Sequence, residues 1–243
     1  MSDFRRSNIE FKVWGRFALF TDPLTKIGGE KCSYHIPTYE ALKGVAKSIY
    51  WKPTIVWVID EVRVMKRIRT QTKGTKPQEY SGGNTLAIYT FLSDVEYQVK
   101  AHFEWNMHRP ELVEDRNEAK HHIVAKRMLE RGGRQDIFLG TRDCQSYVEP
   151  CKFGTRKGAY DTDGDLAYGL MFHGFDYADE TGDNKLHARF WKPTMKNGVI
   201  RFTRPEDCQI RKFVREMSVK KFEQGQNLLG VANEAPLSLE ELT

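Results

Sequence analysis

The sequence has few cysteines, and they form no motif. Its 243 residues include four of them, Cys32, Cys144, Cys151 and Cys208, and none belongs to a CxxC pair. Because disulfide scaffolds carry cysteine at a much higher density, we expect reduced and mostly packed thiols. The same wide spacing disfavours a zinc site, whose ligands come in close pairs.

Long apolar runs and nucleotide-binding signatures are also missing. No stretch approaches the roughly 20 apolar residues that a membrane-spanning helix needs, and residues 1–6 lead into a strand-like pattern without the apolar centre of a signal peptide. The glycine pairs at 28–29, 82–83 and 132–133 match neither GxGxxG nor GxxxxGK[ST]. We therefore expect a cytoplasmic globular protein that uses no membrane and no nucleotide-driven chemistry.

Basic residues are absent from the end of the chain and concentrated elsewhere. The net charge is +5, and no Lys or Arg follows Lys221, whereas four glutamates do. Six basic residues lie between 63 and 76 with no acid among them: Arg63, Lys66, Arg67, Arg69, Lys73 and Lys76. Such a run beside Gly74 is typical of a basic hairpin or loop, which either contacts phosphates or is only solvated.

Hydrophobic periodicity predicts the order of elements in the first 140 residues. In chain order these are a strand over 9–20, a helix over 38–51 capped by Thr38, a strand over 55–64, two strands over 86–103 joined by a turn at Ser93–Asp94, a helix over 115–131 and a short strand over 137–139. The order β-α-β-β-α-β, with one extra or split strand, is that of a ferredoxin-like unit, the arrangement also found in RRM domains.

The texture of the chain changes after Gly140. Short apolar pieces are broken by Gly, Pro and Asp, and helical stripes are missing. We therefore predict an α+β protein with a ferredoxin-like domain over 1–140, a small β-rich domain over 141–217 and a weakly structured acidic tail over 218–243, with at most a short turn at 238–242. Because this fold carries many functions, it decides none of them.

Metal motifs are not found. Asp161-x-Asp163-Gly-Asp165 resembles the start of a calcium loop, but Leu166 and Phe172 stand where an EF-hand needs Gly and Glu. The seven histidines include no HExxH pair. The sequence therefore predicts an acidic turn at 161–165, and neither a metal site nor a cofactor.

The tract Lys120-His121-His122 offers chemistry that needs no metal. An imidazole can remove the proton of an RNA 2′-hydroxyl or protonate the leaving oxygen, and an ammonium can stabilise the negative transition state. The alternative is a solvated helix face. Tyr50, at the end of the first helix, either packs in the core or presents its hydroxyl to a groove.

Several strings in this chain resemble one known family. They are FTDPLTKIGGE at 20–30, PTYEALKG at 37–44, SIYWKPT at 48–54, GGNTL at 82–86, YQVKAHF at 97–103, RNEAKH at 116–121, DIFLG at 136–140 and RPEDC at 204–208. Together they resemble the Dvulg-type (subtype I-C) CRISPR-associated proteins of the Cas-five group, which are crRNA-processing endoribonucleases. The resemblance covers about residues 9–217.

This resemblance implies a function and a set of residues. It implies metal-independent cleavage of the repeat stem-loop of precursor CRISPR RNA, with 2′,3′-cyclic phosphate and 5′-hydroxyl products. The protein would then stay on the 5′ handle of the mature crRNA, beside the backbone and large subunits of the subtype I-C interference complex. The catalytic positions of the family fall on Tyr50, Lys120 and His121, with His122 as the neighbouring candidate imidazole.

Two further expectations follow. Arg63, Lys66, Arg67 and Arg69 would fit contact with the RNA backbone. Tyr50 and His121 lie on different helices, so the connecting loops must bring them together. The alternative function is a non-catalytic RNA-binding subunit of the same complex, with a separate nuclease making the cut.

Overall fold

The computed structural model describes residues 7–27, 29–223 and 225–233. The helices are α1 (Pro23–Ile27), α2 (Tyr39–Ile49), α3 (Glu118–Glu130) and α4 (Ala178–Thr181), with 3-10 turns η1 (Pro110–Asp115), η2 (Pro205–Asp207) and η3 (Val231–Asn233). The strands are β1 (Asn8–Ala18), β2 (Lys31–Cys32), β3 (Ile55–Val64), β4 (Thr70–Thr75), β5 (Ala87–Trp105), β6 (Ile137–Phe138), β7 (Gln145–Pro150), β8 (Asp165–Ala167), β9 (Met171–Asp176), β10 (Lys185–Trp191), β11 (Thr194–Lys196), β12 (Val199–Arg201) and β13 (Ile210–Glu216).

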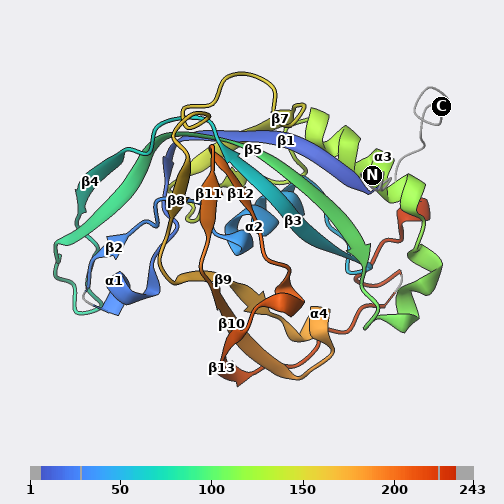
Figure 1. The fold of residues 1–243 in the computed structure, drawn as a ribbon. Coiled ribbons are helices and arrows are strands. Elements are labelled where there is room, and N and C mark those ends of the chain that lie inside the picture. The colour runs from blue at the N-terminus through green and yellow to red at the C-terminus, as the bar shows by residue number, and fades with distance from the viewer. Residues whose placement is uncertain (1–6, 28, 224, 234–243) are drawn as a thin grey trace.

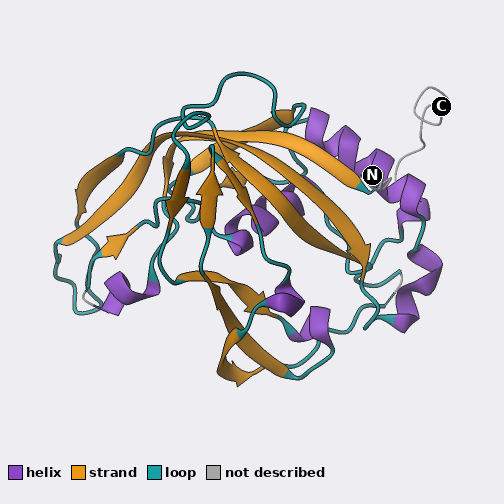
Figure 2. Ribbon diagram, in the orientation of Figure 1, coloured by secondary structure: helices purple, strands orange, loops and turns teal. Residues whose placement is uncertain are grey.

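A ten-stranded sheet arches over α2, and a three-stranded sheet lies below it (Figures 1 and 2). The large sheet has the order β6-β7-β1-β5-β3-β12-β11-β8, with β2 and β4 pairing additionally with β5. The strands β1 and β3 each run antiparallel to β5, so they are parallel to one another. The molecule therefore mixes helices and strands, as the sequence predicts.

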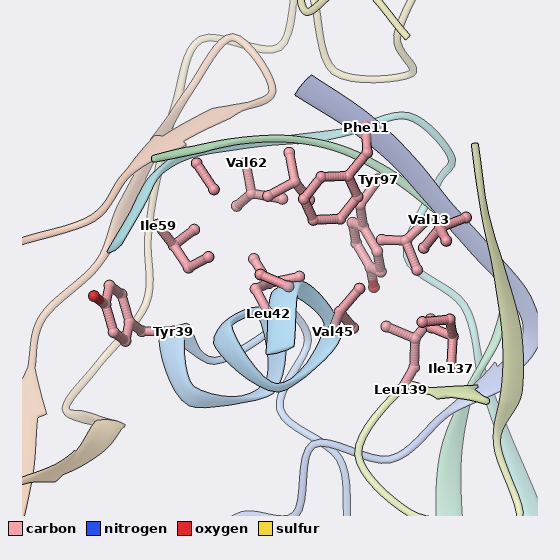
Figure 3. Close-up of a cluster of buried hydrophobic side chains, with 14 of the residues drawn as sticks. Phe11, Val13, Tyr39, Leu42, Val45, Ile59, Val62, Tyr97, Ile137 and Leu139 are labelled. Carbon is pink, nitrogen blue, oxygen red and sulfur yellow. The ribbon is translucent and has the colours of Figure 1, made fainter. Parts of the chain in front are cut away.

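Helix α2 forms where its N-cap residue and its apolar stripe predict a helix. The Thr38 hydroxyl accepts a hydrogen bond from the backbone N–H of Ala41 at 3.2 Å, which satisfies a donor that the first turn leaves open. Leu42 and Val45 point from α2 into the core, towards Ile59 of β3 and Tyr97 of β5 (Figure 3). The packing of α2 thereby fixes where its last residues lie.

The predicted turn at Ser93–Asp94 is wrong, because β5 is one continuous strand. Its first part, up to Leu92, pairs with β4, and its second part, from Tyr97, pairs with β3. Strand β1 pairs with both parts and holds them in line. At the change of partner, Asp94 adopts a positive φ of 53°, and the Ser93 N–H donates to the carbonyl oxygen of Arg69 at 2.9 Å. Turn-forming residues here mark a change of partner.

Strands from both sides of residue 140 share the large sheet. β7 pairs with β1, and β12 pairs with β3. The part that stands apart is the small sheet β13-β10-β9. It is anchored on α2 through α4, where the Glu180 carboxylate accepts hydrogen bonds from Lys43 and, at 2.8 Å, from Lys47. Burial raises the pKa of Glu180, but the two ammonium groups outweigh it and lower that pKa to about 2.

All four cysteines are free thiols. Among the described residues, no helix is long and apolar enough to cross a membrane. The expected turn at 238–242 and the N-terminal residues 1–6 lie outside the described residues. After β13, the regular structure of the described part is the 3-10 turn η3 and a bridge residue at Leu228.

Candidate active site

The ends of two helices meet beneath the sheet. Tyr50 follows α2 with extended backbone angles, φ −158° and ψ 133°, and its carbonyl oxygen accepts a hydrogen bond from the Trp57 indole at 2.7 Å. His121 lies in the first turn of α3. The side chain of the N-cap residue Asn117 accepts a hydrogen bond from the Lys120 N–H at 3.0 Å. The cap of one helix and the end of the other therefore fix both side chains.

Tyr50 and His121 are in direct contact. The Tyr50 hydroxyl lies 2.8 Å from Nδ1 of His121, and Nε2 of the same ring lies 2.7 Å from the backbone carbonyl oxygen of Asp115. A carbonyl oxygen only accepts, so Nε2 carries a hydrogen. In the neutral form of the ring, Nδ1 therefore has no hydrogen and accepts from the tyrosine hydroxyl. The backbone thereby selects the tautomer that presents a basic nitrogen to Tyr50.

Aromatic rings surround this pair. The ring centroids of Phe103 and Trp105, both on β5, lie 6.0 Å and 5.6 Å from that of His121. Tyr50 and His121 are each 0% exposed. In such surroundings a hydrogen bond or a charge acts more strongly than it does in water.

Asp115 is a site residue that the sequence reasoning did not select. Its carboxylate accepts from the Thr54 hydroxyl at 2.5 Å and from the backbone N–H of Val231, and it lies 3.6 Å from Nε2 of His121. The only local sign that Asp115 belongs to the site is its position shortly before the helix that carries His121. Thr54 likewise shows no signal apart from its place in the string at 48–54.

Two lysines reach the C-terminal segment beside this pair. Lys120 donates to the carbonyl oxygen of Ala232 at 2.9 Å, and Lys52 donates to that of Leu229 at 2.5 Å. His122 is half-buried, and burial together with the positive charge of Lys126 lowers its pKa. The imidazole that contacts Tyr50 is that of His121.

The basic run at 63–76 lies against carboxylates. Arg63 is buried and forms a bidentate ion pair with Asp161, at 2.7 Å and 2.8 Å. Arg67 pairs with Asp163, Lys66 pairs with Asp94 at 2.6 Å, and Arg69 is exposed. Three of these four cations therefore have carboxylate partners within the chain.

The acidic turn at 161–165 thus serves as a partner for the basic run. The Arg63 guanidinium beside Asp161 holds the pKa of that carboxyl below its usual value, and Arg67 does the same for the pKa of Asp163. Among the described residues, no group of three or more His, Cys, Asp or Glu side chains is placed to hold a metal ion.

Similar proteins define the class of this chain. Residues 8–203 match the sequence model Cas_Cas5d, described as CRISPR-associated protein (Cas_Cas5). A solved structure titled CRISPR-associated protein has a TM-score of 0.72 and 35% identity, covering 84% of this chain and 96% of that one. The structure of a functionally uncharacterized protein, SMU1763c from Streptococcus mutans, has a TM-score of 0.70 and 38% identity. This match covers 84% of the present chain and 96% of SMU1763c. The chain is a CRISPR-associated protein of the Cas5 group.

Within this group, the chain belongs to the Cas5d family, that of subtype I-C. Two curated relatives carry the name CRISPR pre-crRNA endoribonuclease Cas5d. The one from Mannheimia succiniciproducens is 28% identical over 224 residues, which are 80% of this chain and 94% of the relative. The one from Thermus thermophilus is 26% identical over 177 residues, 68% of this chain and 74% of the relative. The family resemblance noted in the sequence is confirmed.

Proposed function

We propose that this chain is a metal-independent endoribonuclease that cleaves the repeat stem-loop of precursor CRISPR RNA. The observation that carries the proposal is the contact of 2.8 Å between the Tyr50 hydroxyl and His121. Two side chains that are 71 residues apart meet in a family whose curated relatives are named pre-crRNA endoribonucleases. The proposed catalytic residues are Tyr50, Lys120 and His121.

In the proposed reaction, the RNA supplies its own nucleophile. The 2′-oxygen forms a bond to the adjacent phosphorus while the bond from phosphorus to the 5′-oxygen breaks. The products are a 2′,3′-cyclic phosphate and a 5′-hydroxyl. His121 acts as the general acid and base, moving the proton of the 2′-hydroxyl and that of the leaving oxygen. Tyr50 orients the 2′-hydroxyl, and the Lys120 ammonium stabilises the negative charge that develops at phosphorus.

After cleavage, the protein stays on the 5′ handle of the mature crRNA. In this proposal it is a subunit of the subtype I-C interference complex, beside the backbone and large subunits.

We further propose that the RNA-processing part is ferredoxin-like and spans about residues 1–140. The antiparallel pairing of β5 with both β1 and β3 supports this, with α2 connecting β1 to β3 and α3 connecting β5 to β6. The strand on the other side of β1 is β7, which comes from the part that follows. The β-rich part over 141–217 then supplies the small sheet and extends the large one.

One observation favours the alternative, a subunit that binds RNA without cutting it. Tyr50 and His121 are completely buried, so RNA cannot touch them unless part of the chain moves. A chain that keeps this conformation when RNA binds would retain the RNA and leave it intact.

Incubation with repeat RNA in EDTA separates the two functions. We expect one defined cut in the repeat of the organism's own CRISPR locus, because none of the three proposed catalytic side chains is a typical magnesium ligand. The products are read on a denaturing gel, with binding measured separately by filter retention. Retention without any cut would establish the non-catalytic subunit instead.

The exposed part of the basic run is expected to contact RNA phosphates. Changing Arg67 and Arg69 to glutamine should reduce the slope of log affinity against log salt by about 0.7 per lost contact with single-stranded RNA. Arg63→Gln serves as the matched control. It should leave the slope unchanged and lower the melting temperature, because Asp161 then loses its buried partner. An unchanged slope in the Arg67 and Arg69 variants would make the run a solvated surface.

A further inference from the structure

The C-terminal segment of the described chain passes beside α3, the helix that carries His121 (Figure 1). The ring of Phe222 lies 6.1 Å from that of Trp51. Further along, Leu228 is 8% exposed and Val231 is 2% exposed. The segment is therefore docked by apolar side chains onto the region that surrounds Tyr50 and His121.

Its backbone is bound by the polar groups of the site. The carbonyl oxygens of Leu229 and Ala232 accept from the ammonium groups of Lys52 and Lys120, at 2.5 Å and 2.9 Å. The N–H of Val231 donates to Asp115, the residue whose carbonyl oxygen holds His121. Residues of the site thus make three contacts with the backbone of a short stretch of this segment, between residues 229 and 232.

These contacts resemble those that a nucleic-acid strand makes. Two ammonium groups bind oxygens that repeat along a chain, as lysines bind successive phosphates. A phosphate oxygen carries negative charge, so it is a stronger acceptor for an ammonium than a neutral carbonyl oxygen. An RNA strand can therefore displace the segment at both lysines.

The segment is also an element that can leave with little disruption. It contributes no strand to the two described sheets, and its described regular structure is the 3-10 turn η3 and a single bridge residue, Leu228. Elements held by few contacts open locally at a low free-energy cost. By contrast, exposing His121 from the side of Phe103 and Trp105 would require β5 to leave the sheet.

We propose that residues 228–232 occupy the position of the RNA strand in this structure, and that Lys52 is a second phosphate-binding residue beside Lys120. This inference rests on the proposed function. It explains how a completely buried Tyr50–His121 pair becomes accessible, because the bound RNA takes the place of the segment.

Competition of this kind has a kinetic signature. If the segment closes the site for most of the time, the apparent affinity for RNA equals the intrinsic affinity multiplied by the small fraction of molecules that are open. The chemical step in the bound complex is unchanged. Because the protein stays on its product, both constants are measured in single-turnover experiments: KM is the protein concentration that gives half of the maximal cleavage rate, and kcat is that maximal rate. Weakening the segment therefore lowers KM and leaves kcat unchanged.

Two neighbouring leucines provide a matched pair of variants. Leu228 is 8% exposed and Leu229 is 50% exposed. Leu228→Ala removes a buried side chain that docks the segment, so KM for repeat RNA should fall about tenfold with kcat unchanged. Leu229→Ala keeps the backbone carbonyl that binds Lys52 and should change neither constant. Equal KM values for wild type and Leu228→Ala would overturn the displacement of the segment.

The role of Lys52 is measured in the Leu228→Ala background, where loss of its contact with the segment matters least. There Lys52→Met should raise KM and reduce the slope of log KM against log salt by about 0.7, and Lys52→Arg should restore both. An unchanged KM and slope would overturn this assignment. Failure of every variant to cut repeat RNA would contradict the proposed function, whereas cutting with equal KM values contradicts this inference alone.

Discussion

A His121→Ala variant should bind repeat RNA almost as well as the wild type and cleave it about 10²–10⁴ times more slowly. The loss of one well-placed proton-transferring group costs a rate factor of this order. Its ring is held by Asp115 on one side and contacts Tyr50 on the other, at 2.7 Å and 2.8 Å. Single-turnover kinetics with saturating protein isolate the chemical step from binding.

His122→Ala is the matched control for this variant. The two histidines are adjacent, but it is His121 that contacts Tyr50. We expect full cleavage by His122→Ala, and reduced cleavage by Tyr50→Phe and Lys120→Met. A folded His121→Ala protein that cleaves at the normal rate would refute the assignment of His121. If His122→Ala were then inactive, His122 would take the catalytic role.

Replacing the single ribose on the 5′ side of the cut by 2′-deoxyribose should abolish cleavage and leave binding intact. The proposed side chains, Tyr50, Lys120 and His121, move protons and stabilise charge but supply no nucleophile. The 2′-hydroxyl of the RNA must therefore attack, and the deoxy substrate has none. The measurement is a denaturing gel of the deoxy and all-ribose substrates, each with and without EDTA.

A water-based route with two metal ions gives the opposite result in both comparisons. It cleaves the deoxy substrate, since the nucleophile is a metal-bound water, and it stops in EDTA. A cut in the deoxy substrate would therefore end the proposed mechanism. A deoxy substrate moved one nucleotide away from the cut is the control and should be cleaved normally.

The fold could be predicted from the sequence where the signals are local. The cap at Thr38 and the apolar stripe of α2 lie within a few residues of one another, and the helix forms where they place it. The glycines at 132 and 133 follow the end of α3, each with a positive φ, and the helix predicted over 115–131 ends there. The turn at Ser93–Asp94 was wrong because the same residues suit a strand that changes partners, and the partners lie elsewhere in the chain.

The candidate catalytic residues were chosen from the resemblance to a known family, because the sequence contains no local pattern that brings them together. Periodicity places Tyr50 and His121 on separate helices, and their contact depends on packing that no local pattern contains. Arg63 and Asp161 are 98 residues apart, so their ion pair left no sequence signal. The contacts of Lys52 with Leu229 and of the Asp115 carboxylate with Val231 involve the C-terminal segment, and composition does not specify the path of that segment.

The hydrogen bond from His121 to Asp115 has a consequence for how the sequence can drift. The atom that accepts from Nε2 is a backbone carbonyl oxygen, and every amino acid provides one. Substitutions at position 115 that keep the shape of η1 therefore preserve the tautomer of His121, although they lose the carboxylate contacts with Thr54 and Val231. The path of the main chain, and not the side chain at position 115, thus determines which imidazole nitrogen carries the hydrogen. Related chains can therefore change residue 115 without changing the tautomer of the histidine.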